Sequence, residues 1–188
     1  MKHRRFQWIC AGVGSLFLLL NLGCHADKTV TTVDALWPAY TFYEAIEEAE
    51  TIVYGKVVDK GTTQIEEHVI GEDKTFKEYY RDVTIEVIEM LKGDEESATV
   101  NYIEMGGETS TQVTQYSGVV PVSAGDRVIL FLRENGSYIC PDGLFTEDEE
   151  GMITVPQNMM PQTNEMALEA ENRCAVAEYC EWIRNTLA

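Results

Sequence analysis

The body of the chain carries short apolar runs separated by polar turns, which is the pattern of a mainly β protein. Residues 52–59 are rich in Val and Ile, and Gly55 inside this run indicates a bulge or a sharp coil. Residues 79–90 form a longer strand candidate, in which the alternating pattern slips at Ile88. Such a slip indicates a bulge that bends the strand. The pattern therefore predicts strongly curved strands.

Four more strands are predicted, at residues 98–104, 112–116, 127–132 and 138–140. The run after Arg127 is continuously apolar, so we expect that strand at the centre of a sheet, buried on both faces. Asn135-Gly136 predicts a two-residue hairpin turn, because both turn positions need positive φ. Residues 61–77 are polar and predict a loop or an irregular hairpin.

Two helices are predicted, one on each side of the strands. Thr41-Phe-Tyr-Glu44 has the pattern of a capping box, and it begins a short helix at residues 42–49. The second helix is expected to begin near Thr163 or Asn164 and to end near Thr186. Strands do not alternate with helices, which disfavours a parallel α/β sheet. We expect a small, curved OB-like barrel with a short N-terminal helix and a long C-terminal helix, over residues 39–188.

The first 23 residues have the layout of a secretory signal peptide. A positive start, Met1-Lys-His-Arg-Arg5, precedes an apolar run from Trp8 to Leu20, and polar residues begin after Cys24. The apolar run is short for a transmembrane helix, so an uncleaved anchor is the less favoured interpretation. The sequence predicts export.

Two kinds of signal cleavage compete at this site. Leu20-Asn-Leu-Gly-Cys24 resembles the lipobox of bacterial lipoproteins, which implies that Cys24 becomes the lipid-carrying N-terminus. Asn21 stands where that motif usually has Leu. Ordinary cleavage after Ala26 is the alternative and would release a secreted protein. Lipidation is the favoured interpretation, and residues 24–38 would then form a tether to the membrane.

The charge is strongly acidic and excludes one class of partner. All three basic residues of the leader lie before Phe6, so the rest of the chain carries 11 basic and 32 acidic residues, a net charge of −21. Nucleic acid is excluded as a partner, because its phosphates would be repelled. A direct electrostatic grip on anionic lipid is excluded for the same reason. Any contact with the membrane would depend on the N-terminal lipid.

Three stretches together carry a family resemblance: residues 49–57, 83–93 and 125–132. Their layout resembles the OB-fold barrel of netrin-like domains and of the tissue inhibitors of metalloproteinases, and it is similar to uncharacterised bacterial lipoproteins built on such a barrel. The resemblance spans about residues 44–140 and implies the barrel fold. In the inhibitors, an N-terminal Cys-x-Cys binds the protease zinc. Here Cys24-His25-Ala26 lacks the second Cys, so inhibition does not carry over with the fold.

Cysteines are the next candidate chemistry. Cys140, Cys174 and Cys180 would face an oxidising environment in an exported protein. Cys174 and Cys180 lie six residues apart on the predicted helix, a rise of about 9 Å, which is too far for a bridge between them. A disulfide from Cys140 to Cys180, or else to Cys174, would attach the last helix to the barrel. Three buried free thiols are the alternative.

Neither a catalytic nor a metal-binding motif stands out. His68 falls in the predicted polar loop, away from any recognisable Ser, Cys or acid arrangement, and no zinc spacing is present. We therefore expect no metal, no cofactor and no enzymatic activity. The expected function is an extracytoplasmic binding or structural module, with an extracellular protein or a glycan as partner. An inhibitor of secreted peptidases is the first alternative, and a hydrolytic envelope enzyme is the second.

Overall fold

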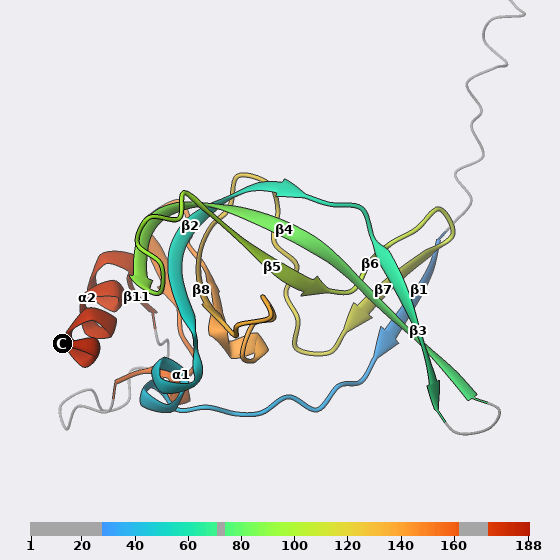
Figure 1. The fold of residues 1–188 in the computed structure, drawn as a ribbon, viewed down its shortest axis with the longest axis horizontal. Coiled ribbons are helices and arrows are strands. Elements are labelled where there is room, and N and C mark those ends of the chain that lie inside the picture. Colours follow the sequence, from blue (N-terminus) through green and yellow to red (C-terminus); the bar gives the residue numbers. More distant parts are fainter. Residues whose placement is uncertain (1–27, 71–73, 162–172) are drawn as a thin grey trace, which may run out of the picture.

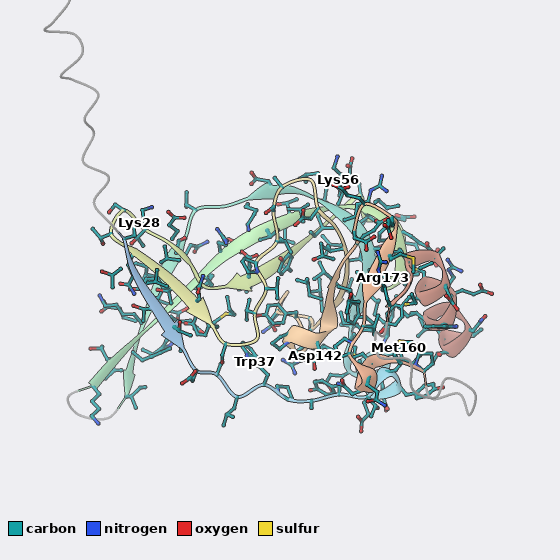
Figure 2. All side chains as sticks on the ribbon, turned by 180° about the vertical axis from the view of Figure 1, so that it is seen from behind. Lys28, Trp37, Lys56, Asp142, Met160 and Arg173 are labelled. Carbon is teal, nitrogen blue, oxygen red and sulfur yellow. The ribbon has the colours of Figure 1, made fainter. Side chains whose placement is uncertain are left out.

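The computed structural model describes residues 28–70, 74–161 and 173–188 (Figure 1). The signal peptide and Cys24 lie outside these ranges, as does the first part of the expected C-terminal helix. The described chain is mainly β with two α-helices, as predicted. Lys28, where the described chain begins, lies toward one end of the molecule, and Arg173 and Met160 lie toward the other (Figure 2).

The elements follow one another in a simple order. The strands are β1 (Thr29–Val33), β2 (Thr51–Lys60), β3 (Gln64–Ile70), β4 (Lys74–Lys92), β5 (Thr99–Met105), β6 (Gly107–Glu108), β7 (Gln112–Tyr116), β8 (Arg127–Leu132), β9 (Leu144–Thr146), β10 (Met152–Thr154) and β11 (Arg173–Ala175). The helices are α1 (Phe42–Glu48) and α2 (Val176–Leu187), with short 3-10 turns η1 (Pro141–Gly143) and η2 (Gln157–Met159).

One large sheet dominates the fold. Its strand order is β3-β4-β2-β8-β9, and β5 pairs with another part of β4. Two smaller sheets, β1-β7-β6 and β10-β11, complete the set. The ladders of the large sheet do not close into a barrel. Beyond them, isolated bridges join Ile103 to Ser137 and Leu132 to Tyr138.

Bulges bend the two longest strands where the sequence predicted them. The β2–β4 register skips Ile88, because Tyr54 pairs with Glu89 and Gly55 pairs with Val87. Ile88 is the extra residue, and it is exposed. Gly55 is required at this bulge, since a Cβ there would lie 2.6 Å from the carbonyl oxygen of Glu86. Both bulge predictions are confirmed.

The predicted turn at Asn135-Gly136 differs in its length. A hairpin does form, but its loop has three residues, because the Arg133 amide donates to the Ser137 carbonyl at 2.8 Å and the Gly136 amide donates to the Arg133 carbonyl at 3.0 Å. Gly136 has φ of +78°, as the third residue of such a loop requires. The side-chain oxygen of Asn135 accepts a hydrogen bond from the Ser137 amide within this loop.

Three regions differ from the sequence-based expectation. Where a loop or an irregular hairpin was predicted, β3 and the first part of β4 pair in a regular antiparallel register. Within the expected tether, β1 pairs in parallel with β7, so this segment belongs to the fold. At the C-terminus, Arg173–Ala175 form β11 against β10, and α2 begins only at Val176. In each case pairing with another strand forms the element, and for β1 and β11 that strand is distant in sequence, so local patterns do not reveal it.

Two hydrophobic clusters support the fold. The larger one packs α1 and α2 against one side of β8, with Phe131, Tyr179 and Ile183 fully buried. The smaller one lies within the curve of β2, β4 and β5, around Val83 and Tyr102. The capping box is confirmed: the Thr41 hydroxyl accepts from the Glu44 amide, and the Glu44 carboxylate accepts from the Thr41 amide. The central β8 is buried from Val128 to Leu132, as predicted.

Candidate functional site

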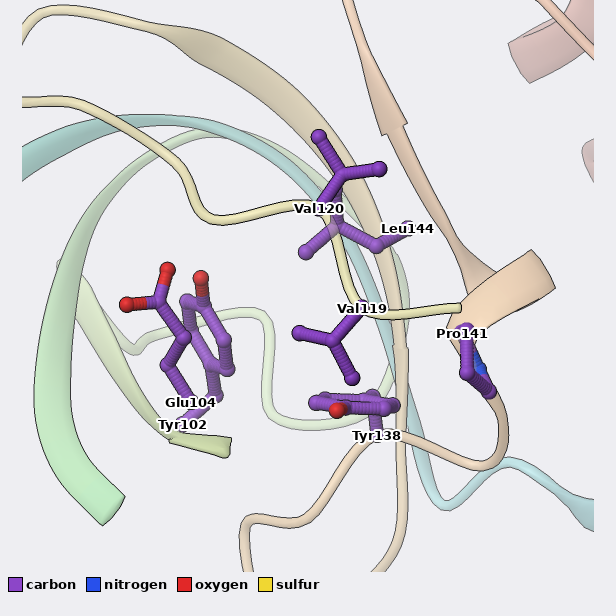
Figure 3. A pocket seen from close by; sticks show the side chains of 7 residues that line it. All are labelled: Tyr102, Glu104, Val119, Val120, Tyr138, Pro141 and Leu144. Carbon is purple, nitrogen blue, oxygen red and sulfur yellow. The ribbon is translucent and has the colours of Figure 1, made fainter. Parts of the chain in front are cut away.

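A small pocket lies at one edge of the smaller cluster (Figure 3). Its lining comes from β5, the loop before β8 and the segment around η1, and consists of Tyr102, Glu104, Val119, Val120, Tyr138, Pro141 and Leu144. Its volume of about 40 Å³ has room for a few water molecules. Val119 faces the ring of Tyr138, and Tyr102 lies beside Glu104 (Figure 3).

Two tyrosine hydroxyls in this pocket are buried. The side-chain oxygens of Tyr102 and Tyr138 have no hydrogen-bond partner within the part of the chain that the structure describes. Burial also raises the pKa of both phenols, so that they stay neutral donors. An unpaired buried hydroxyl costs free energy. Ordered water or a very small polar group is the kind of partner that fits the space.

Glu104 fills the polar side of the pocket with a buried ionic cluster. The residue is 1% exposed, and its carboxylate accepts a hydrogen bond from the Val122 amide at 2.8 Å. Lys60 Nζ lies 3.2 Å from Glu104 Oε2, and Arg81 Nε donates to the same oxygen. Lys60 also donates to the Val122 carbonyl oxygen. The cluster therefore holds the loop before β8 against β5, which is a structural role.

Burial of the tyrosines disfavours an aromatic stacking platform on the surface. Tyrosines on strands can form a stacking platform for ligands, but Tyr102, Tyr116 and Tyr138 are each 5% exposed or less. Their rings pack in the interior instead, where they cannot stack on a sugar or a base. The pocket beneath them is too small for a cofactor. Neither feature makes a chemical site by itself.

The β3–β4 hairpin is a more accessible feature. It projects from the body at the end far from α2 (Figure 1). Ile65, Val69 and Ile70 on β3 are 48%, 76% and 58% exposed. Among the described strands, β3 pairs only with β4, so its outer edge is unpaired. An unpaired edge with exposed apolar side chains can pair with another chain.

The same hairpin brings together three potential metal ligands. Oxygen atoms of Glu66 and Glu78 and a ring nitrogen of His68 all lie within 4.8 Å of one another. His68 Nε2 is 3.0 Å from Glu78 Oε2. This group was not predicted from the sequence, because the loop or irregular hairpin expected at residues 61–77 fixes no strand register. The spacing of Glu66 and His68 could have indicated the group, because these two residues share one face if the segment is a strand.

The three described cysteines lie in the larger hydrophobic cluster. Cys140, Cys174 and Cys180 are buried free thiols in the structure, so the bridge favoured from the sequence is not formed in it. Burial raises the pKa of Cys140 and Cys174 to about 11 and that of Cys180 to about 12. A nucleophilic cysteine needs the opposite shift. The lipidation candidate Cys24 lies outside the described residues.

Comparison with known proteins adds no relative. The sequence matches no protein-family model and no curated protein. None of the helices in residues 28–70, 74–161 and 173–188 is both long and apolar enough to cross a membrane.

Proposed function

We propose that this protein is an exported, non-catalytic binding module, held at the outer face of a membrane by a lipid on Cys24, and that it binds an extended segment of another extracellular protein along β3. The layout of the leader supports export, and the Leu20–Cys24 sequence supports lipidation. The observation that carries the binding role is the projecting hairpin, with its unpaired edge and exposed apolar side chains.

A protein partner fits this surface better than a glycan. Glycan sites commonly use exposed aromatic rings, whereas three of the strand tyrosines are buried. Backbone groups along a strand edge instead bind an extended peptide through main-chain hydrogen bonds, and alternate side chains give specificity. The chain has a formal net charge of −18, which favours a basic partner and disfavours nucleic acid.

We propose further that the large sheet and its bridges form an OB-like barrel that is only partly closed. Following the ladders and the isolated bridges gives the circular order β2, β4, β5, residues 137–139 and β8, with a parallel bridge between Ile103 and Ser137. OB-folds are five-stranded, partly open barrels that bind ligands next to the loop between their first two strands. Here that connection is extended into β3 and the first part of β4, which supports the hairpin as the binding element.

The non-catalytic part of the proposal rests on the state of the ionisable groups. The pKa values of the three buried thiols are raised, so these groups stay protonated and unreactive near neutral pH. The buried Glu104 is engaged by Lys60, Arg81 and a backbone amide, which supports a structural role for this carboxylate.

Selection from a library of displayed linear peptides tests the binding role. We expect the protein to enrich basic peptides with alternating apolar residues. Val69→Lys on the edge strand should abolish this binding, because charged side chains on an edge block strand addition. Ile88→Lys is the matched control: Ile88 is also an exposed apolar residue, but it lies on the inner strand β4. Loss of binding in both variants, or enrichment of no peptide, would refute the proposal.

Two further measurements test the anchor and the alternative function. The intact mass of the protein from the membrane fraction should correspond to a chain that begins at diacylated Cys24, whereas a chain beginning at Asp27 would show ordinary cleavage. A panel of secreted metalloproteases should be unaffected by the purified protein. Inhibition would favour the peptidase-inhibitor hypothesis instead.

A further inference from the structure

The register of the β3–β4 hairpin places two carboxylates directly opposite each other. Glu66 pairs with Glu78, and His68 lies two residues further along the same face of β3. Like charges directly opposite each other destabilise a strand pair. The hairpin forms in spite of this repulsion.

The acidic residues on the two faces of the hairpin have different partners. On one face Glu67 forms an ion pair with Lys77 at 2.8 Å. On the other face, no Lys or Arg among the described residues forms an ion pair with Glu66 or Glu78. On this face His68 contacts Glu78 at 3.0 Å. Lys74 lies at the far end of the same face, opposite Ile70. A bound cation would neutralise this face in the way that Lys77 neutralises the other.

The imidazole is also held in place for ligation. The His68 ring stacks on Phe76, its cross-strand partner, with ring centroids 6.4 Å apart and an interplanar angle of 27°. Stacking on a neighbouring ring limits the rotamers that His68 can adopt. The three ligand atoms already lie within 4.8 Å of one another, so small side-chain rotations bring them to the spacing that one metal ion requires.

We propose that Glu66, His68 and Glu78 form a surface site for a first-row divalent metal ion, with zinc as the best fit. Zinc binds imidazole nitrogen and carboxylate oxygen, and three protein ligands leave a coordination position for water or for a ligand from another molecule. Calcium and magnesium prefer sites with only oxygen ligands. The site is independent of the peptide-binding proposal, because it needs only the hairpin to be folded.

Isothermal titration of zinc into the untagged, metal-free mature protein tests the site. We expect one ion per chain with micromolar affinity, retained in the presence of excess magnesium. Glu66→Gln and His68→Ala should each weaken the affinity by about tenfold or more, because each removes a direct ligand. Glu67→Gln is the matched control, since it removes a neighbouring acid on the opposite face and should leave the affinity unchanged.

Cobalt provides a direct second readout. Cobalt bound through the imidazole should give visible absorption bands that His68→Ala abolishes, and far-ultraviolet circular dichroism should establish that this variant is folded. The proposal is overturned if zinc gives no heat, if magnesium displaces it fully, or if Glu66→Gln and His68→Ala bind zinc as tightly as Glu67→Gln.

Discussion

The Tyr179 hydroxyl donates a hydrogen bond to the carbonyl oxygen of Met159 at 2.9 Å. This bond joins α2 to the short turn η2 that lies beside α1, inside the larger hydrophobic cluster. The hydroxyls of Tyr102 and Tyr138 are equally buried but have no partner among the described residues. The three tyrosines therefore compare a buried hydroxyl that has a hydrogen-bond partner with two that have none among the described residues.

Replacing each of these tyrosines by Phe should separate the two situations. Tyr179→Phe leaves the Met159 carbonyl unpaired and should lower the free energy of unfolding by about 1–2 kcal/mol. Tyr102→Phe and Tyr138→Phe remove an unpaired donor and should leave the stability unchanged or raise it. Urea denaturation of the three variants checks this. A loss in Tyr102→Phe as large as that in Tyr179→Phe would indicate that water or a ligand in the pocket pairs with the hydroxyl.

Glu104→Gln should destabilise the protein strongly. The substitution keeps the size of the side chain but leaves Lys60 and Arg81 without their shared anion, in a place where their side chains are only 18% and 21% exposed. Breaking a buried ionic cluster in this way costs about 3 kcal/mol, measurable as a lower urea midpoint. Glu108→Gln is the control, because its ion pair with Lys28 is exposed and should contribute nothing measurable. Equal midpoints for the two variants would contradict this role of Glu104.

Gly55→Ala should disrupt the bulge between β2 and β4. A Cβ at this position would lie 2.4 Å from Ile85 Cγ2 and 2.6 Å from the Glu86 carbonyl oxygen, so the strands must shift apart, at a cost of about 3 kcal/mol. At Gly125 the φ angle is +97° but nothing lies within 4 Å of the added Cβ. Gly125→Ala should therefore cost only the backbone strain, about 1 kcal/mol. Thermal unfolding of both variants compares the two costs, and a larger loss at Gly125 would refute the assignment.

The buried thiols predict a loss of stability at alkaline pH. Burial raises the pKa of Cys140 and Cys174 to about 11 and that of Cys180 to about 12, from an ordinary value of 9.0. Above pH 9 the thiols of the unfolded chain ionise while those of the folded chain do not. The stabilising contribution is therefore complete below pH 9 and is lost as the pH rises toward 11 to 12. Each thiol steepens this loss by at most about 1.4 kcal/mol per pH unit.

Cys180→Ala isolates the contribution of one thiol. The slope of unfolding free energy against pH should become shallower in this variant between pH 9 and 11, by at most about 1.4 kcal/mol per pH unit. The slope, not the absolute stability, is the readout, so a small cavity left by the substitution does not interfere. An unchanged slope without reductant, together with a shallower slope in its presence, would mean that Cys180 is disulfide-bonded in the protein.

Local patterns predicted the parts of the fold that depend on local chemistry. The capping box at Thr41 and Glu44, the helix it begins and the bulge at Ile88 all follow from residues close together in the sequence. The regular pairing of β3 with β4 was not predicted, because its polar residues resemble a loop or an irregular hairpin until their cross-strand partners are known. β1 was missed for the same reason, since β7, about 80 residues away, supplies its pairing.

The candidate sites were even harder to predict than the strands. The proximity of Glu66, His68 and Glu78 depends on the hairpin register, and a shift by one residue would move Glu78 to the opposite face from the other two. The Glu104 cluster joins β2, β4, β5 and a loop, so no spacing in the sequence reveals it. Both sites are products of strand pairing.

β4 is a single strand of 19 residues that begins in the projecting hairpin and ends in the body of the large sheet. Its first part pairs with β3, and its later part lies between β2 and β5. No loop or hinge separates the two parts, so the sheet sets the direction in which the hairpin points. A partner that binds the hairpin thus meets an arm whose direction is already fixed. A force that pulls on this arm acts along β4 and therefore shears the hydrogen bonds that join β4 to β2 and β5.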